Sequence, residues 1–402
     1  MNHVALLIPG LDRIAGAERQ VMALAKGLRL RGWRVTVLAL SGSGGQAAVE
    51  LNSAGVEFLS LEMRKGLADA RGWIRFNRWL NRHRPQVVHA HLPHAAWLAR
   101  WSRLTTPTQM FSGLGASAPV FVDTLHSSST GGLCRRICYR SSDWLAGSVT
   151  AVSQSVADTH LAARMVSRNK LSVVHNGVDV DEFHPDSSLR SSARRELGLN
   201  DEFLWLAAGR LEPVKDYPTL LHAFAFLRGN PRLLVAGAGS LESELRRLAA
   251  RLGIQRRVRF LGFQPDVKPW LRAADAFVLS SLWEGLPVGL LEAGACALPS
   301  VATDVPGSRE VIVRGRTGRL APSGSPVDLA QVMTAMMHSS PRDRRIMGNL
   351  ARLHVTERFS LEAMIDRSEN LYRSLLARRY EPNRERRDTL EFRRASVASP
   401  HR

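Results

Sequence analysis

Two acidic side chains, Glu284 and Glu292, lie just after an apolar run that resembles a buried strand, in "WEGLPVGLLEA" (residues 283–293). A proline precedes Val288 and suits a helix start, which places the first acid in a loop and the second in the second helical turn. Ionised carboxylates only accept hydrogen bonds, and a vicinal diol offers two donors. The first free amides of the helix, at Val288 and Gly289, suit a phosphate. The stretch therefore predicts two hydroxyl-binding acids beside a phosphate site.

Two basic side chains follow a second apolar run, residues 203–208. Arg210 comes directly after it, and Lys215 comes just before a helical pattern. An arginine fork and a lysine point charge at a strand end can hold a diphosphate between them, although solvated surface cations are the simpler alternative. A further loop, 9–19, enters a helix near Gly16, where the backbone can approach an anion. Together these groups match a nucleotide diphosphate sugar.

Short strand-like runs alternate with helical patterns through most of the chain. Helix-period segments such as 17–30 and 71–84 lie between them. The predicted strands are 4–8, 34–40, 86–90, 120–124, 171–174, 203–208, 232–235, 258–261, 276–279 and 300–303. This alternation predicts an α/β fold of two doubly wound, Rossmann-like parallel sheets, with the ligand at the carboxyl ends of the strands, in a cleft between two domains.

The length of 402 residues also favours two domains. The expected division is an N-terminal domain over 1–180, a linker over 181–202, a C-terminal domain over 203–360 that carries the predicted nucleotide-sugar groups, a helix over 361–380, and a basic, unstructured tail over 381–402. Three cysteines without metal-ligand spacing suit a reducing compartment, and no apolar run is long enough to cross a membrane. We expect a cytoplasmic protein.

In these motifs the chain resembles a family 4 glycosyltransferase of the GT-B class, over roughly residues 1–375. The matching pieces are G-R-x(4)-K at 209–215, "GAG" at 237–239, "LGF" with "PDV" within 261–267, E-x(7)-E at 284–292, "VPGSREVI" at 305–312, "AGAE" at 15–18, "TLHS" at 124–127, "AVS" at 151–153 and "HNGVD" at 175–179. Their order and spacing make the resemblance specific. It implies two Rossmann-like domains that face each other across a cleft, with the acceptor side in 1–180 and the nucleotide sugar in 203–360. It also implies that the helix 361–380 packs back towards the N-terminal domain, and that the configuration at the transferred sugar is retained.

The resemblance also implies roles for single residues. Arg210 and Lys215 would bind the donor diphosphate, Glu292 the ribose, and Glu284 the transferred sugar. A second set would complete the site: Gly16 at the phosphates, His126 near the reacting carbon, and the 262–267 loop, with Gly262 and Phe263, against the base. The family often has two glycines where this chain has Ala15 and Gly16, and alanine restricts that turn. Arg210, Lys215 and the helix amides at 288–289 would stabilise the leaving group without a metal, so no cofactor is expected.

The formal charge of +19 exceeds what a donor site needs. On a helical wheel, the segment 71–84 gathers its arginines on one side and aromatic residues on the other. This pattern fits either an anionic membrane surface or a helix packed on its sheet with a solvated basic face. Even in the second case the basic face and the tail could meet lipid headgroups.

The sequence therefore predicts a retaining glycosyltransferase that moves a sugar, such as that of a UDP-sugar, to a lipid-linked or polysaccharide acceptor. Cell-envelope or exopolysaccharide synthesis, lipopolysaccharide included, is the expected setting, at the cytoplasmic membrane face. A GT-B nucleotide-sugar epimerase is one alternative, and a non-catalytic polyanion-binding protein is another. The acidic pair argues against the latter and against nucleic acid, because carboxylates repel polyanions.

Overall fold

The computed structural model describes residues 1–12, 14–64, 69–105 and 119–378. The chain forms two compact units, each described by itself. Unit 1 comprises Met1–Thr124, Ser141–Thr150 and the segment from Ile365 onward, and unit 2 comprises Leu125–Arg140 and Ala151–Met364. The predicted tail, 381–402, lies outside the described residues, and the domain bounds expected from the sequence stay a prediction.

The first sheet has seven strands in the order β3-β2-β1-β4-β5-β6-β7. Its strands are β1 (His3–Ile8), β2 (Arg34–Ala39), β3 (Glu57–Ser60), β4 (Val87–His91), β5 (Val120–Leu125), β6 (Ser148–Ala151) and β7 (Leu171–Val173). The helices between them are α1 (Gly16–Leu30), α2 (Gly45–Ser53), α3 (Ala70–His83), α4 (Pro93–Ser102), α5 (Leu133–Ser141) and α6 (Gln154–Ala162). The pairings of β1 with β2 and β4, of β2 with β3, and of β4 with β5 are parallel, as expected for strands joined through helices.

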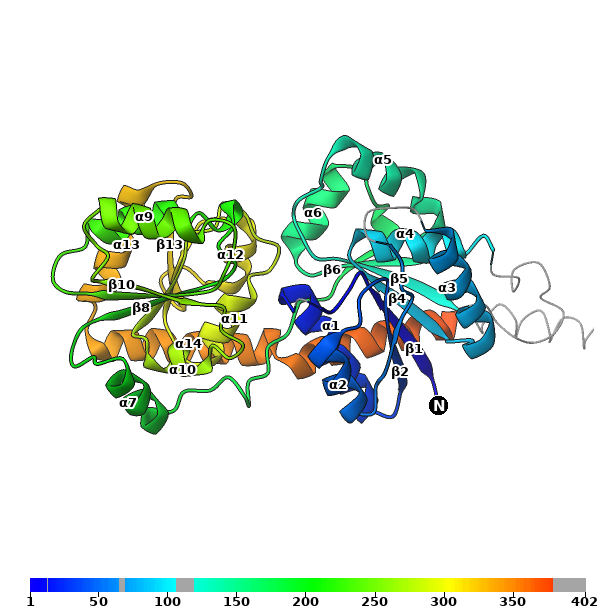
Figure 1. Cartoon of the computed structure of the whole chain (residues 1–402), viewed down its shortest axis with the longest axis horizontal. Helices are drawn as coiled ribbons and strands as arrows, with labels where there is room; N and C mark the ends of the chain where they lie inside the picture. The colour runs from blue at the N-terminus through cyan, green and yellow to red at the C-terminus, as the bar shows by residue number, and fades with distance from the viewer. Residues whose placement is uncertain (13, 65–68, 106–118, 379–402) are drawn as a thin grey trace, which may run out of the picture. The chain divides into compact units, whose positions relative to one another are not determined.

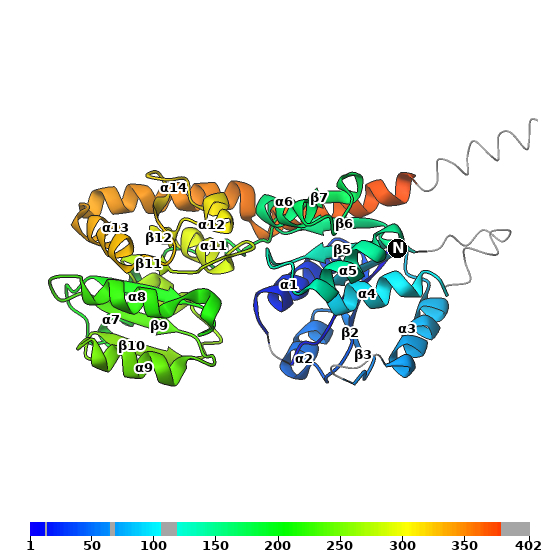
Figure 2. The same ribbon diagram turned by 90° about the horizontal axis from the view of Figure 1, so that it is seen from above.

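Helix α3 carries the basic segment 71–84, and the structure decides between its two interpretations. Phe76 and Leu80 are buried in a core cluster with β1, β4 and α4, and Trp79 is buried beside them. Figure 2 shows α2 and α3 on opposite sides of β2 and β3. The aromatic face therefore packs on the sheet, and the outward side carries exposed arginines such as Arg78 and Arg82. This face of α3 presents positive charge to a lipid surface, but no aromatic side chain.

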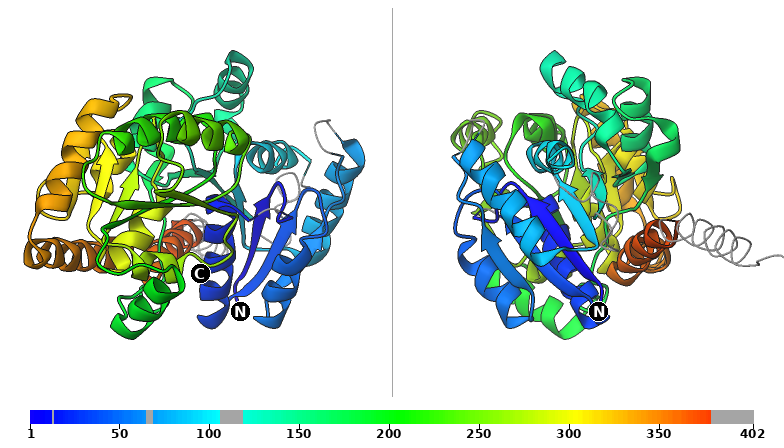
Figure 3. Two further views of the ribbon diagram at one scale, coloured as in Figure 1. Left: turned by 60° about the vertical axis from the view of Figure 1, so that its left-hand side comes forward. Right: turned by 90° about the vertical axis from the view of Figure 1, so that its right-hand side faces the viewer.

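The last helical segment, residues 361–378, returns to unit 1 from Ile365 onward. Glu369 accepts hydrogen bonds from Trp33 Nε1 (3.1 Å) and Arg31 Nη1 (3.0 Å). The Tyr372 hydroxyl lies 2.5 Å from His89 Nδ1 inside the same core. Figure 3 shows this orange-red segment beside the blue elements of unit 1. Buried polar contacts of this kind fix the register of the segment because each partner would otherwise be buried alone.

The second sheet has six strands in the order β10-β9-β8-β11-β12-β13. Its strands are β8 (Leu204–Ala208), β9 (Arg232–Ala236), β10 (Val258–Gly262), β11 (Ala276–Leu279), β12 (Ser300–Thr303) and β13 (Gly318–Ala321). Its helices are α7 (Ser187–Glu196), α8 (Tyr217–Ala225), α9 (Glu242–Arg251), α10 (Lys268–Ala273), α11 (Val288–Ala295), α12 (Pro306–Val311), α13 (Pro326–His338) and α14 (Pro341–Phe359). Helices α8, α9 and α13 cover one face over a continuous apolar core, and Figure 1 shows α9 and α13 across the sheet from α10 and α14.

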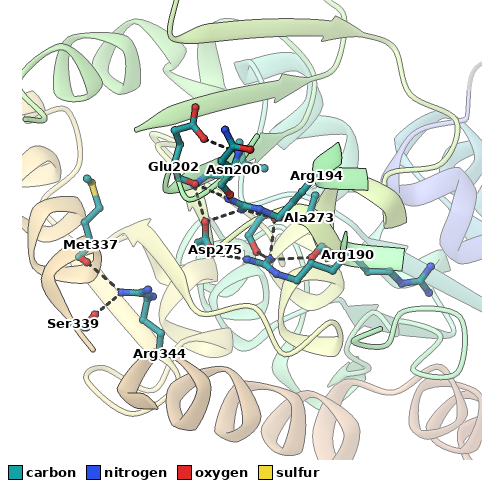
Figure 4. A network of polar contacts seen from close by, with 12 residues as sticks. Arg190, Arg194, Asn200, Glu202, Ala273, Asp275, Met337, Ser339 and Arg344 are labelled. Carbon is teal, nitrogen blue, oxygen red and sulfur yellow. Dashed lines mark hydrogen bonds and ion pairs between the residues drawn. The ribbon is translucent and has the colours of Figure 1, made fainter. Parts of the chain in front are cut away.

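A helix, α7, occupies part of the segment expected as a linker, 181–202. Asp186 caps its first turn by accepting from the amides of Ser188 and Leu189. Its Arg190 and Arg194 both bind Asp275, with N–O distances of 2.6 and 3.1 Å, at the start of β11 (Figure 4). The segment is thus tied to the second sheet through charge-assisted hydrogen bonds, which a polar composition alone did not reveal.

Candidate functional site

The second sheet reverses its strand order between β8 and β11, which pair with each other. Ligands of doubly wound sheets bind where the strand order reverses, outside the carboxyl ends of the strands. The loop after β8 carries Arg210 and Lys215, and the loop after β11 carries Glu284. The acidic and basic stretches predicted from sequence are therefore brought together at one position of the sheet edge.

Lys215 and Glu284 form an ion pair there, with Lys215 Nζ 2.5 Å from Glu284 Oε1. The two side chains are 18% and 12% exposed, so water screens the pair only partly. Ser281 Oγ donates to the same carboxylate oxygen at 2.6 Å, and Ser128 Oγ donates to the Glu284 carbonyl at 2.7 Å. The sequence motifs assigned both charged residues to the site of the nucleotide-sugar donor, but did not predict that they would bind each other.

Helix α11 begins at Val288 after Pro287, as predicted, and Glu292 lies in its second turn. Glu292 is buried, with 8% of its surface exposed. A Cβ added at Gly289 would lie 3.6 Å from the Ala208 carbonyl, so the first turn of the helix adjoins the end of β8. The helix N-terminus and its partial positive charge therefore lie at the strand reversal, beside the loop that carries the cations.

Glycines hold three strand-end loops against one another. The Gly209 amide donates to the Ala236 carbonyl at 2.9 Å, and the Gly237 amide donates to the Gly262 carbonyl at 2.8 Å. A Cβ at Gly237 would come within 1.9 Å of the Gly209 carbonyl oxygen, so no larger residue fits without moving the backbone. The Tyr217 hydroxyl also donates to that oxygen, at 3.1 Å. These contacts fix the backbone next to Arg210.

Two predicted donor residues are accessible at this edge. Arg210 is exposed, and Phe263, beyond the end of β10, is 63% exposed. An exposed aromatic ring after a strand offers a flat surface on which a base can stack. Neither side chain makes a described contact that would oppose the role given to it by the family pattern.

His126 lies in the loop after β5 and is half-buried. Desolvation lowers the pKa of its imidazole to about 4, so the ring is neutral at pH 7. A Cβ at Gly285 would come within 2.6 Å of the His126 carbonyl oxygen, which places this loop against the residue that follows Glu284. The histidine and the Glu284 loop are thus neighbours in unit 2.

Glu310, on α12, is not among the site residues predicted from the sequence. Its carboxylate accepts from the amides of Gln154 (2.9 Å) and Ser155 (2.8 Å), the first of α6, and lies 3.4 Å from His175 Nε2. Burial alone would raise the pKa of Glu310, but these hydrogen bonds hold it below its usual range. Gly307 of the same helix abuts the Glu284 Cβ. Glu310 lies in the motif "VPGSREVI" and His175 in "HNGVD", so the motifs marked both segments but did not show that these two residues are partners.

Gly16, the predicted phosphate contact of the first domain, is the exposed first residue of α1 in unit 1. The preceding Ala15 has φ −113°, an extended conformation that alanine adopts without strain. Its amide donates to Glu18 Oε2 at 3.1 Å. The alanine in "AGAE" therefore does not distort this helix start.

An Asp-x-Asp tripeptide, Asp179–Asp181, has a spacing that can hold a metal. Asp179 Oδ1 instead accepts from the amides of Asp181 and Glu182, both at 3.0 Å, in a local turn. Across the described part of the chain, no three His, Cys, Asp or Glu side chains are grouped as metal ligands. The expectation of metal-independent chemistry stays a prediction.

Two sequence families match the chain in its two halves. The family described as "Glycosyltransferase Family 4" matches residues 14–182, and "Glycosyl transferases group 1" matches residues 190–354. The chain belongs to the family 4 glycosyltransferases. This confirms the resemblance found in the motifs, and the two parallel α/β sheets confirm the predicted fold class.

Named relatives include D-inositol 3-phosphate glycosyltransferases of Streptomyces. The one from Streptomyces avermitilis is 32% identical over 297 residues, which is 68% of this chain and 62% of the relative, and the one from Streptomyces bingchenggensis is matched over only 47% of its length. The chain thus spans about half to three-fifths of these relatives. An Escherichia coli relative, "UDP-Gal:alpha-D-GlcNAc-diphosphoundecaprenol alpha-1,3-galactosyltransferase", is 24% identical and covers 76% of this chain and 80% of its own.

Among solved structures, Anabaena HepE in complex with UDP and glucose superposes with a TM-score of 0.81. The superposition covers 93% of this chain and 100% of HepE at 20% identity. A similarity at that sequence identity establishes the shared fold, with two Rossmann-like sheets. The ligand of this chain has to be inferred from its own residues.

Proposed function

We propose that the chain is a retaining glycosyltransferase that moves a sugar from a nucleotide diphosphate sugar to a lipid-linked or polysaccharide acceptor. The observation that carries the proposal is the juxtaposition of Lys215, Glu284 and the α11 N-terminus where the second sheet reverses its strand order. A cation and free amides suit a diphosphate, and carboxylates suit sugar hydroxyls.

In this proposal the leaving nucleoside diphosphate gains negative charge as the glycosidic bond breaks. Arg210, Lys215 and the amides of Val288 and Gly289 stabilise that charge, and the chemistry needs no metal. Because Lys215 is paired with Glu284 before the donor binds, its ammonium must turn at least partly towards the phosphates. Glu284 is then released to accept from the hydroxyls of the sugar, while Glu292 holds the ribose.

The neutral imidazole of His126 suits a position near the reacting carbon, where the sugar develops positive charge. A charged imidazolium there would oppose that development, and desolvation disfavours it by lowering the pKa to about 4. Phe263 and the backbone at Gly262 would receive the base.

The acceptor and setting rest on relatives. One is named for transfer to a diphosphoundecaprenol-linked sugar and another for transfer to inositol phosphate. Both names describe acceptors with phosphate groups, which accords with the charge of +19. We therefore propose an anionic, lipid-linked or glycan acceptor in cell-envelope or exopolysaccharide synthesis, reached at an anionic membrane surface. Within the part of the chain that is described, no helix is both long and apolar enough to cross a membrane.

A panel of UDP-, GDP- and ADP-sugars tests the donor proposal by thermal shift. A ligand at 100 times its Kd stabilises the folded state by about 2.7 kcal/mol, so one member of the panel should raise Tm clearly. Arg210→Ala and Lys215→Ala should abolish the shift and slow transfer by roughly 2–4 kcal/mol of barrier. A panel without any shift, or variants that keep normal turnover, would end the proposal.

The same experiment separates the alternatives. An epimerase would release free nucleotide and altered sugar without an acceptor. A polyanion-binding protein would bind nucleic acid in a salt-sensitive manner and ignore every nucleotide sugar. The acidic pair at the strand reversal favours neither alternative.

A further inference from the structure

Helix α5 shows large apolar side chains to solvent. It spans Leu133–Ser141, and Leu133 and Ile137 are 69% and 55% exposed. They are four residues apart and so lie on one face of the helix. Cys134 and Cys138, both exposed and neither in a disulfide, continue that face. Of the described residues of α5, only Tyr139 is fully buried. The helix therefore exposes an apolar face, whereas an ordinary surface helix buries its apolar face.

The charges of α5 have one sign. Arg136 and Arg140 are exposed along one border of the apolar face, and Arg135 is half-buried. The chain has no Asp or Glu between Asp123 and Asp143, so no acid in the sequence near the helix neutralises these arginines. A helix with apolar residues on one face and cations beside them fits the boundary of an anionic bilayer, where side chains enter the acyl region and guanidinium groups meet phosphates.

The position of α5 along the chain links it to the candidate site. The loop that precedes it carries His126 and Ser128, and Ser128 donates to the Glu284 carbonyl at 2.7 Å. A lipid surface held at α5 would therefore lie at the end of a short loop that contacts the sugar-binding acid.

We propose that α5 is the membrane-contacting element of this protein, and that its Leu133, Ile137, Cys134 and Cys138 face enters the surface of a bilayer rich in anionic lipid. This deepens the proposed function, because it rests on the membrane-side acceptor suggested there. It also differs from the basic face of α3, whose aromatic residues are in the core. On α3 the exposed apolar area is limited to Ile74, at 42% exposure, whereas α5 exposes Leu133 and Ile137 at 69% and 55% beside its arginines.

The first test uses the protein's own cysteines. Cys134 and Cys138 are exposed, whereas Cys296 is buried and desolvation raises its pKa to about 12, so it serves as an internal unreactive control. Maleimide labelling of the wild-type protein is followed by mass spectrometry in buffer, with zwitterionic phosphatidylcholine vesicles, and with vesicles that also contain phosphatidylglycerol. Anionic vesicles should slow labelling of both exposed thiols by roughly five-fold or more, because a water-soluble maleimide does not reach thiols that have entered the acyl region. Unchanged labelling of vesicle-bound protein would overturn the proposal.

The second test uses matched variants and vesicle sedimentation. Leu133→Ser with Ile137→Ser should weaken binding to anionic vesicles by roughly ten-fold or more. The variant lacks the favourable free energy of transferring two large apolar side chains from water into the bilayer. Ile346→Ser with Leu353→Ser is the control, since these side chains on α14 are 49% and 54% exposed but lie elsewhere. The control should bind vesicles like the wild type. Equal losses in both pairs, or no loss in the α5 pair, would refute a role for this helix.

Two further readouts separate the explanations. The α5 variant should keep the wild-type thermal shift with the donor, so loss of lipid binding alone leaves the donor site intact. If the wild-type protein shows no thermal shift with any nucleotide sugar, that result would instead count against the proposed function. Light scattering tests whether the face joins two copies of the chain. A dimer that the α5 substitutions dissociate, with vesicle binding unchanged, would replace the membrane proposal.

Discussion

The ion pair between Lys215 and Glu284 makes an unusual prediction about affinity. If the lysine must leave its carboxylate to reach a diphosphate, then Glu284→Gln should strengthen the binding of a nucleoside diphosphate that carries no sugar. The gain arises because the ligand no longer competes with an internal anion for the same ammonium group. Lys215→Met should instead weaken the same binding, since it removes a charge-assisted hydrogen bond to phosphate.

The size of the effect follows from the burial of the pair. Exposed ion pairs contribute about 0–1 kcal/mol, and breaking a fully buried one costs about 3–5 kcal/mol. With side-chain exposures of 18% and 12% and an N–O distance of 2.5 Å, this pair lies between those limits. We expect about 1–2 kcal/mol, which corresponds to a Kd that is roughly 5- to 30-fold lower in the Glu284→Gln variant.

Isothermal titration calorimetry with the four members of a double-mutant cycle measures this. The double variant should bind like Lys215→Met alone, because without the ammonium group there is nothing to release. Glu212→Gln is the control, since it removes the same charge from the loop that carries Lys215, where Glu212 accepts from Ser240. The reasoning fails if Glu284→Gln weakens nucleoside diphosphate binding as strongly as Lys215→Met, since the glutamate would then position the lysine. It also fails if Glu212→Gln gives the same gain, which would indicate a general effect of charge.

Three further outcomes follow from the site. Gly237→Ala should destabilise the protein by about 2–4 kcal/mol in chemical denaturation, because its Cβ would lie 1.9 Å from a backbone oxygen, whereas Gly253→Ala, where space is open, should cost only about 1 kcal/mol. Glu292→Gln should weaken binding of free nucleoside diphosphate as well as of nucleotide sugar, and normal calorimetric affinity for the free diphosphate would contradict its assignment to the ribose. Glu310→Gln should lower the free energy of unfolding by about 1–2 kcal/mol at pH 7. Since the folded pKa of Glu310 lies below its ordinary 4.5, this difference should be constant above that pH and vanish in denaturation curves at lower pH.

Much of the fold could be predicted from the sequence because buried parallel strands are nearly continuous apolar runs. β11 and β12 have the bounds that were predicted, seven other predicted strands differ by one residue at one end, and β4 is shifted by one residue at both ends. Three strands were missed, each with four residues: β3 (Glu57–Ser60), β6 (Ser148–Ala151) and β13 (Gly318–Ala321). β3 and β13 lie at sheet edges, where a short and partly polar strand gains its hydrogen bonds only from a neighbour that the local sequence does not specify.

The candidate site shows the same division. The spacing of Glu284 and Glu292 around a helix start, and the position of two cations after a strand, could be read locally because a helix start and a strand end are set by a few adjacent residues. The pairing of Lys215 with Glu284 joins residues 69 apart in sequence, and the capping of α6 by Glu310 joins residues more than 150 apart. No local pattern specifies such partners, since they depend on which strand ends become neighbours when the sheet assembles.

Local sequence patterns were enough to specify the kinds of groups available to this protein, namely a diphosphate-binding set, hydroxyl-accepting acids and an excess of cations. Helix period and residue type were sufficient for that, because both act over a few residues. Which of these groups meet, and which helix faces remain in water, depends on how the sheets and helices pack. The aromatic side of α3, suited to a membrane by its pattern, is buried because the sheet offers it more apolar contact, and the plainer α5 keeps Leu133 and Ile137 exposed because only its Tyr139 side reaches a core.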